Sequence, residues 1–322
     1  GIYSKFRKKH VVSSLDEVHE LLSHYLHEHI EIHITSDQFV NFMITNHKEI
    51  LTSYRCFPDY NSSYIFSDKI RTERLAGKLG ISCPQSIRLC EIDEMHYDQF
   101  PSIAKWNKRI GGEPFKTKLI GSSKMLRQAK AKYENMSEII VQKYIRSESN
   151  VGLSYAGIFS KGVEVAGIAV HQERQYPTGL SSYVQEYTGQ RADQVRSIAQ
   201  QILSATRYSG WAEVEFRYDD SKDKIYLIEV NPRACGWIKI MKRKYGISLF
   251  NDKTCGITHS CKPSAWINVL RDLCAIMDMA HKNRKKVNYQ TIFKDYMSKP
   301  ITDIFEFDDL KPFLSQFRKL TH

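Results

Sequence analysis

The chain has 322 residues, of which 42% are hydrophobic and 26% charged, and its formal net charge is +11 at pH 7. This length suits two or three linked subdomains, and the composition is that of a soluble globular protein. No apolar run approaches the ~20 residues of a membrane span. The basic start GIYSKFRKKH has no apolar stretch behind it, so we expect no signal peptide and no membrane span.

Cysteine usage and charge distribution bear on the compartment and the partners. Seven cysteines occur without CxxC spacing, which favours free thiols in a reducing compartment over a disulfide framework or a zinc site, and hence a cytoplasmic protein. Lysine and arginine are spread among the acids. The positive charge therefore favours a site for anionic small molecules over a nucleic-acid interface, and a homodimer is left open.

The N-terminal part alternates helix and strand signals. Residues 15–26 carry apolar side chains at helical spacing after a cap at Ser13 or Ser14, and residues 30–34 alternate as a strand. A further helix is expected within 35–51, with Thr35-Ser36-Asp37 as its cap. This order predicts an α/β layer of the open-sheet kind.

Two segments bring single lysines to the ends of regular elements. Asp68-Lys69 precedes a predicted helix over 71–79, which Gly80 ends as a left-handed cap. Residues 101–106 form a short predicted strand that delivers Lys105. From the residues alone, each of the two is a surface lysine at the end of an element.

The middle of the chain predicts strands around one amphipathic helix. Residues 138–145 form an apolar strand that enters a polar segment, residues 153–170 and 180–187 alternate as strands, and residues 192–207 form the helix. Arg174 lies before a Pro/Gly loop. An arginine there either clamps a carboxylate or phosphoryl group bidentately or is a loop arginine held in a salt bridge.

Residues 210–237 are predicted to form a β-hairpin. Ala212–Tyr218 and Ile225–Val230 have the strand pattern, and the polar run 219–224 is the turn between them. Beyond the hairpin, residues 234–249 contain a helix-like segment. Residues 266–282 predict a helix with Ile267, Leu270, Leu273 and Met277 on one face.

The hairpin also carries the candidate metal ligands. Alternation places Glu213 and Glu215 on one face of the first strand, while Glu229 lies near the end of the second strand with Asn231 just beyond. Paired strands can aim Glu215, Glu229 and Asn231 at one point, and such oxygen ligands suit Mg²⁺. The alternative is an ordinary hairpin whose acids are solvated.

The run Glu229-Val-Asn231-Pro232-Arg233, which follows a strand ending in Tyr-Leu-Ile, resembles the metal-binding strand of the ATP-grasp superfamily. The resemblance extends from about Ser4 to the C-terminus and is to the carboxylate–amine ligase branch, near D-aspartate ligases and carbamoyl-phosphate synthase large chains. It implies an ATP-grasp fold: α/β overall, α+β in the nucleotide module, with a shortened N-terminal open-sheet α/β domain.

The resemblance also implies the domain limits and a nucleotide site. The limits are an N-terminal domain over 1–67, a lid subdomain over 68–146 and a C-terminal subdomain with the Mg²⁺ site over 147–322. The residues implied to bind the nucleotide are Lys69 and Lys105 at the phosphates, Gln142, Lys143, Tyr144 and Ile145 at the adenine, and Glu148, or alternatively Ser149, at the ribose. Gly111-Gly112, among cations, is implied to form a mobile flap.

The activity so implied is an ATP-dependent ligase that joins a carboxylate to an amine through an acylphosphate and releases ADP and phosphate. ATP with Mg²⁺, or Mn²⁺, serves the reaction, and Arg174 and Arg233 steady the acyl carboxylate and the acylphosphate. The substrates are small molecules, of an amino-acid or peptide-like kind. Alternatives are a carboxylase-like or kinase-type ATP-grasp enzyme and a non-catalytic nucleotide-binding module.

Overall fold

The computed structural model describes residues 10, 12, 14–25, 31–46, 55–109, 111–133, 137–146, 152–177, 179–246, 263–283, 287–305 and 309–320. The chain forms two compact units, which are described separately. The larger unit comprises His29–His171 and Tyr187–Cys235, and the smaller unit comprises Gly1–Glu28, Gln172–Glu186 and Gly236–His322.

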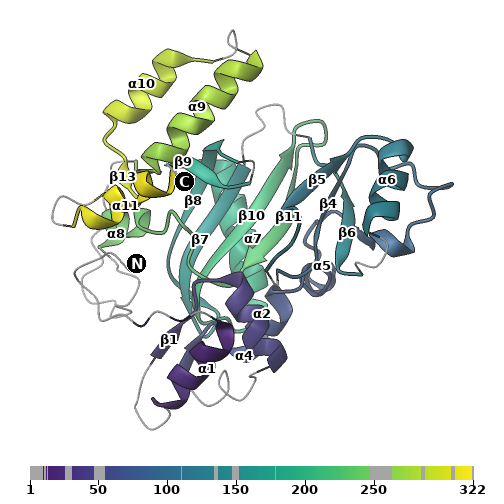
Figure 1. Ribbon diagram of the computed structural model, residues 1–322, viewed down its shortest axis with the longest axis horizontal. Helices are drawn as coiled ribbons and strands as arrows, with labels where there is room; N and C mark the ends of the chain where they lie inside the picture. Colours follow the sequence, from purple (N-terminus) through teal and green to yellow (C-terminus); the bar gives the residue numbers. More distant parts are fainter. Residues whose placement is uncertain are drawn as a thin grey trace. The chain divides into compact units, whose positions relative to one another are not determined.

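The larger unit contains two antiparallel sheets and a parallel pair of short strands (Figure 1). Its strands are β1 (Glu31–His33), β2 (Arg55–Phe57), β3 (Ser86–Arg88), β4 (Ser102–Trp106), β5 (Thr117–Ile120), β6 (Ile139–Lys143), β7 (Gly152–Ser160), β8 (Val163–Gln175, of which the part up to His171 belongs here), β10 (Gly210–Asp219) and β11 (Lys224–Asn231). Its helices are α2 (Asp37–Asn46), α4 (Tyr60–Phe66), α5 (Lys69–Lys78), the 3-10 helix η1 (Leu89–Glu91), α6 (Ser123–Tyr133) and α7 (Gln190–Ala205).

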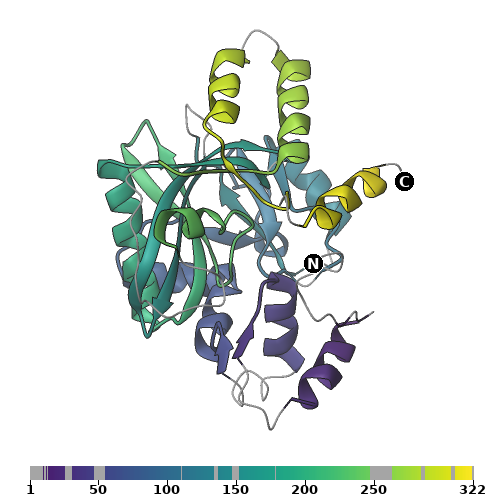
Figure 2. The same cartoon turned by 90° about the vertical axis from the view of Figure 1, so that its left-hand side faces the viewer.

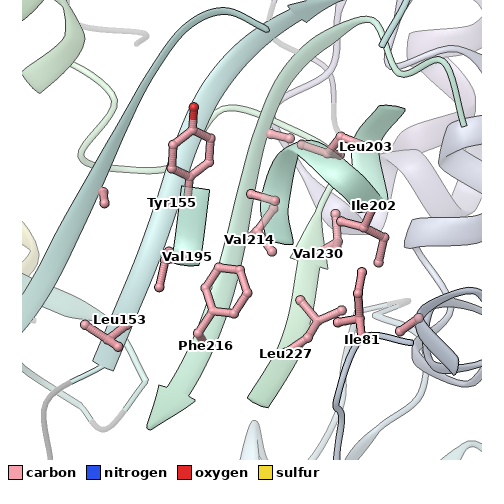
Figure 3. Packing of buried hydrophobic residues seen from close by; sticks show 14 of the residues in the cluster. Ile81, Leu153, Tyr155, Val195, Ile202, Leu203, Val214, Phe216, Leu227 and Val230 are labelled. Carbon is pink, nitrogen blue, oxygen red and sulfur yellow. The ribbon is translucent and has the colours of Figure 1, made fainter. Parts of the chain in front are cut away.

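The first sheet has the order β11-β10-β7-β8 within this unit, and α7 covers one of its faces. Figure 3 shows Val195, Ile202 and Leu203 of α7 against Val214 and Leu227 of the sheet. The amphipathic pattern predicted for residues 192–207 is thus confirmed, because the buried positions of α7 recur at helical spacing. Each such apolar side chain, once buried, contributes about 1.5–3 kcal/mol to stability.

The second sheet has the order β3-β6-β4-β5 and its own core. Leu126, Ala129 and Tyr133 of α6 are buried against apolar side chains of the sheet, among them Ile139 and Val141. Strand β4 pairs with β5 on one side and with β6 on the other. The side chain of Lys105 in β4 is only 5% exposed, and its Nζ reaches the backbone of β11.

The N-terminal part of the larger unit is a parallel β1–β2 pair with α2 between them in sequence. Ser36 acts as the cap of α2, since its Oγ accepts from the backbone N–H of Phe39 at 3.4 Å. Asp37, which the sequence also allowed as the cap, points its carboxylate to an arginine described below. A strand–helix–strand order with a parallel pair is the predicted open-sheet pattern in a short form.

The smaller unit contains a helix pair that Figure 2 shows side by side, α9 and α10. Its elements are α1 (Leu15–Ser23), the end of β8, β9 (Ser181–Glu186), α8 (Ile240–Tyr245), β12 (Ala265–Ile267), α9 (Val269–Asn283), α10 (Tyr289–Met297), β13 (Ile301–Thr302) and α11 (Lys311–Leu320). Ser14 caps α1 by accepting from the backbone N–H of Glu17 at 3.2 Å, as predicted.

One predicted element was wrong at its start. Residues 266–282 do not form one helix, because Trp266 and Ile267 belong to β12, which pairs with β9 and β13. An aromatic next to a β-branched residue packs well on a half-buried sheet, and this packing outweighs the helical periodicity. In α9 itself, Leu273 and Met277 are exposed to 47% and 70%, so the predicted apolar face is not a buried one.

The three-part division at residues 67 and 146 stays a prediction, since the chain's own contacts define the two units given above. Within the described residues, no helix combines the length and apolarity that crossing a membrane requires.

Replacing glycine by alanine should have opposite effects on stability at two positions, Gly167 and Gly77. A Cβ added at Gly167 in β8 would lie 1.6 Å from Oη of Tyr155, whereas one added at Gly77 in α5 would meet nothing within 4 Å. Gly167→Ala should lower the free energy of unfolding by about 1–3 kcal/mol or more through overpacking. Gly77→Ala should raise it by about 0.5–1 kcal/mol, because alanine loses less backbone entropy in a helix. Urea unfolding of both variants measures this, and equal effects at the two sites would contradict the packing.

Candidate active site at the carboxyl end of β11

The predicted hairpin is confirmed, and its register sets the site. Strands β10 and β11 pair antiparallel, with Glu215 opposite Glu229 and Glu213 opposite Asn231. Side chains of directly opposed residues share a face and have Cβ atoms about 4.5–5.5 Å apart. The four side chains therefore form one polar group on the sheet face opposite the core residues Val214 and Phe216 of β10.

A β-bulge in β11 makes this arrangement possible. Phe216 pairs with Leu227 and Glu215 pairs with Glu229, so Ile228 is the extra residue. Leu227 and Val230 both lie in the core although they are three residues apart. Without the bulge, strict alternation would put Glu229 on the same face as Leu227, in the core.

Lys105 lies next to the bulge and contacts its extra residue, Ile228. Its Nζ donates to the carbonyl oxygen of Ile228 at 3.3 Å, and burial lowers the pKa of this ammonium to about 8, against the opposing effect of Glu229. Lys69, at the start of α5, is 9% exposed, and its Nζ lies 3.1 Å from Oε1 of Glu229. Two lysines from separate elements thus reach the same end of β11.

Asn107 holds the two lysine-bearing elements together and was missed by the sequence analysis. It is fully buried just after β4, and its backbone carbonyl and side-chain Oδ1 accept from the N–H groups of Lys69 and Ile70 at 3.2 and 3.0 Å. Its Nδ2 donates to Glu138 at 3.1 Å. A single asparagine gives no sequence signal for this function, because the partners are far apart in the chain.

The pKa values of the two glutamates shift in opposite directions because their neighbours differ. Burial by itself raises the pKa of Glu229, but the ammonium groups of Lys69 and Lys105 outweigh it and lower the pKa to about 2. Burial raises the pKa of Glu215, and the facing Glu229 carboxylate raises it further. Asn231 offsets part of this by donating from Nδ2 to Glu215 at 2.9 Å and to Glu213 at 3.3 Å.

This donor set fits a hard divalent cation. Two half-buried carboxylates that face each other repel, and a cation between them would relieve that repulsion while taking carboxylate and amide oxygens as ligands. No group of three or more His, Cys, Asp or Glu side chains arranged for a metal occurs among the residues that the structure describes. The protein therefore offers two carboxylates and an amide, which is typical of Mg²⁺ sites completed by substrate oxygens and water.

Arg233 lies just beyond this group and is bound by Asp37 of α2. The two side chains form a bidentate pair, with Nε 2.6 Å from Oδ1 and Nη2 2.7 Å from Oδ2. Although burial lowers the pKa of Arg233, the Asp37 carboxylate outweighs burial and raises it. The sequence suggested Asp37 only as a helix cap, so this contact was not predicted.

The predicted adenine segment lies at the end of β6. Gln142 is buried, and its Nε2 donates to Oγ of Ser86 at 2.8 Å and to the carbonyl of Pro84 at 3.3 Å. The backbone N–H of Tyr144 donates to the carbonyl of Pro101 at 3.0 Å, Ile145 is buried and Lys143 is exposed. The proposed ribose ligand Glu148, with its alternative Ser149, lies outside the described residues.

Arg174 belongs to the smaller unit, where two aspartates bind it. Its Nε and Nη2 pair with Asp272 at 2.9 and 3.1 Å, and its Nη1 lies 2.5 Å from Oδ2 of Asp295. Ser182 and Tyr296 also donate to Asp272, which is fully buried. These contacts tie α9 and α10 to the end of β8, which is the salt-bridge alternative that the sequence left open.

The fold to which this geometry belongs can be assigned by comparison. The chain superposes on N5-carboxyaminoimidazole ribonucleotide synthetase in its ADP complex with a TM-score of 0.65, over 82% of this chain and 73% of that one, at 15% sequence identity. The chain has the ATP-grasp fold, as the resemblance in the sequence predicted.

Two curated relatives are similar in sequence. The C-terminal section of the carbamoyl phosphate synthase large chain from Methanopyrus kandleri is 25% identical over 193 residues, which is 56% of this chain and 35% of that protein. D-alanine–D-alanine ligase from Saccharophagus degradans is 22% identical over 185 residues, which is 54% of this chain and 57% of that protein. The matches thus span less than two thirds of either relative, and no family model matches the chain.

The buried network around Arg174 predicts a loss of stability when the arginine is removed. Arg174→Met leaves the Asp272 carboxylate buried without its cation, and breaking a pair of this kind costs about 3–5 kcal/mol. Lys282→Met removes an exposed lysine, 69% accessible, whose pair with Asp278 should contribute about 0–1 kcal/mol. Urea unfolding compares the two variants. An Arg174→Met protein as stable as the wild type would argue for a role toward the substrate instead.

Proposed function

We propose that the protein is an ATP-dependent ligase that joins a carboxylate to an amine through an acylphosphate, releasing ADP and phosphate. The observation that carries this proposal is the convergence of Lys69, Lys105, Glu215, Glu229 and Asn231 at the bulged end of β11. The ATP-grasp fold and the two ligase and synthase relatives support it.

The chemistry requires activation of the acid. A carboxylate does not react with an amine at a useful rate, because its leaving group would be oxide. In the first step, the carboxylate oxygen bonds to the γ-phosphorus of ATP, the bond to the bridging oxygen breaks and ADP leaves. In the second step, the amine nitrogen bonds to the acyl carbon, phosphate leaves with the former carboxylate oxygen, and the amine loses a proton.

The residues at β11 meet the electrostatic demands of the first step. The ammonium groups of Lys69 and Lys105 offset charge on the phosphates from fixed positions, where water does not have to reorganise around them. Glu215, Glu229 and Asn231 would hold Mg²⁺ or Mn²⁺, which neutralises the triphosphate when bound. In a buried site such interactions are stronger than in water.

The remaining residues are assigned to the nucleotide and to the acid. Gln142, Lys143, Tyr144 and Ile145 would hold the adenine at the end of β6, with Glu148 at the ribose. Arg233 would steady the acyl group and its phosphate. Arg174 would steady the acyl group in the same way only if a substrate group replaced Asp272 or Asp295 as its hydrogen-bond partner.

The substrates are small molecules, and we place at least one of them in the amino-acid or peptide-like class. The protein is assigned to the cytoplasm. The free thiols of the described cysteines Cys83, Cys90, Cys235 and Cys274 support a reducing compartment. A carboxylase-like reaction that activates bicarbonate is the second candidate, and the structural match to a carboxyaminoimidazole ribonucleotide synthetase favours it over a kinase. The retained lysines and carboxylates at β11 argue against a non-catalytic nucleotide-binding module.

Nucleotide product analysis tests the reaction type. With Mg-ATP and pooled amino acids, the wild type should give substrate-dependent ADP and free phosphate. Glu229→Ala should reduce the rate by at least about 100-fold, since it removes about 2.7 kcal/mol or more of transition-state stabilisation. Glu91→Gln, at an exposed glutamate, should leave the rate unchanged. AMP with pyrophosphate as the products would mean adenylation and exclude the acylphosphate route.

Nucleotide affinity tests the role of Lys105. Lys105→Met keeps the length of the side chain but removes its charge, and a hydrogen bond to a charged group contributes about 1.5–3 kcal/mol. We expect the Kd for ADP, measured by calorimetry, to rise by about 10- to 100-fold. The exposed Lys124→Met variant should bind ADP as the wild type does. Unchanged affinity in Lys105→Met would place Lys105 away from the phosphates.

A further inference from the structure

The glycine flap that the sequence resemblance implies lies between β4 and β5. We use the name for residues 108–109 and 111–116. Gly111 and Gly112 have φ values of +96° and +74°, which residues other than glycine rarely adopt. The carboxylate of Glu113 accepts from the backbone N–H of Gly111 at 2.9 Å and lies 3.7 Å from Nε of Arg109. The flap is therefore folded around Glu113, and we expect its residues to move together.

Helix α2 contacts this flap through side chains on one of its faces. Nδ2 of Asn41 donates to the backbone carbonyl of Arg109 at 3.0 Å and to that of Asp37 at 3.1 Å. The side chain of Gln38 packs against Gly111, because a Cβ added at this glycine would lie 3.3 Å from Cδ of Gln38. Side chains three apart in a helix share a face. Two neighbouring side chains of α2 thus hold the flap, one by a hydrogen bond and the other by packing.

Position 41 is an unusual place for an asparagine. It lies in the interior of α2 and is only 5% exposed. Asparagine is a weak helix former because its amide competes for backbone hydrogen bonds, and a buried amide is costly unless it is hydrogen-bonded. The bond that Asn41 makes outside its own helix goes to the flap and offsets this cost. The conflict between the residue and its helix therefore points to a function of Asn41 toward the flap.

Helix α2 is also bound to the end of β11. Asp37, one turn before Asn41, forms the bidentate pair with Arg233, at 2.6 and 2.7 Å. Arg233 follows Glu229 and Asn231, which are candidate metal ligands, by a few residues. Through Asn41 and Asp37, α2 connects the flap to this strand. The position of the flap relative to β11 is therefore set by α2 as well as by the two strands that the flap joins.

We propose that Asn41 is a positioning residue for nucleotide exchange. Its hydrogen bond to Arg109 latches the glycine flap to α2, and this bond has to break before ATP enters the site or ADP leaves it. All groups of the latch belong to the protein, so the latch slows entry and release alike and contributes little to affinity. The inference rests on the nucleotide site of the proposed function, but not on which acid is activated there.

Stopped-flow kinetics with a fluorescent ADP analogue, N-methylanthraniloyl-ADP, tests the latch. Association is followed on mixing with the protein, and dissociation on displacement by excess ADP. Asn41→Ala should raise both rate constants about 2- to 10-fold, as expected for the loss of one neutral hydrogen bond. Their ratio, the Kd, should stay within about twofold of the wild-type value. Asn46→Ala, the same substitution at an exposed position of α2, should change neither rate constant.

Further variants and a second measurement separate the latch from a general loss of structure. Asn41→Leu cannot donate, but it fills more space than alanine and suits a helix, so it should show the same pair of raised rate constants. Amide hydrogen exchange should be faster in the flap of both variants, while α7 exchanges as in the wild type. If neither variant folds, Gln38→Ala, at an exposed position, decides: both rate constants should rise by a smaller factor.

The outcomes separate this inference from the proposed function. Unchanged rate constants in a folded variant would overturn the latch. A rise in Kd that comes from dissociation alone would overturn it too, because it would indicate weakened binding instead of faster exchange. A wild-type protein that does not bind the ADP analogue would overturn both proposals. If both rate constants rise in Asn41→Ala but the wild type forms no ADP with any acid, the latch stands and the ligase reaction falls.

Discussion

Two ammonium groups and two carboxylates meet at the end of β11, where they are largely shielded from water. The need to keep these charges paired constrains how the elements of the larger unit pack. Lys69 neutralises Glu229 at 3.1 Å, and Lys105 is held at the backbone of Ile228. Neither lysine would be stable in a buried position without these partners, because isolated buried charge is costly. The helix α5 and the strand β4 that carry them must therefore stay next to β11, and Asn107 joins the two by its hydrogen bonds. Such a preformed arrangement suits charge stabilisation, since little has to reorganise when a charged substrate binds.

The bulge at Ile228 is the geometric device that reconciles this site with the core. It lets Leu227 and Val230 pack under α7 while Glu229 and Asn231 join Glu215 on the opposite face. It also frees the carbonyl to which Lys105 donates. One inserted residue thus serves packing and chemistry together, and bulges are known to occur next to active sites for this reason.

The N-terminal segment and the smaller unit each contribute a charge pair of their own. Asp37 on α2 binds Arg233 just beyond β11, which links α2 to the site. In the smaller unit, Arg174 joins two helices through Asp272 and Asp295. An arginine before a Pro/Gly loop looks the same in sequence whether it clamps a substrate or a helix. The difference lies in the aspartates that fold against it, about 100 residues further along the chain.

The sequence by itself determined the hairpin, the helix α7, a helix at 71–79 that the structure has as α5 from Lys69 to Lys78, and the ATP-grasp resemblance carried by Glu229, Asn231 and Arg233. These are local signals: periodicity, turn residues and a motif within five positions. Only the tertiary structure decided which face Glu229 occupies, that Trp266 lies in a strand, and that Asp37 binds Arg233 rather than capping α2. The physical reason is that each of these depends on a partner distant in sequence: a neighbouring strand that imposes a bulge, a pair of flanking strands beside an aromatic, or a charge that outweighs a local hydrogen bond. Residue patterns encode what a segment prefers alone, whereas burial and charge pairing choose among those preferences after the segments meet.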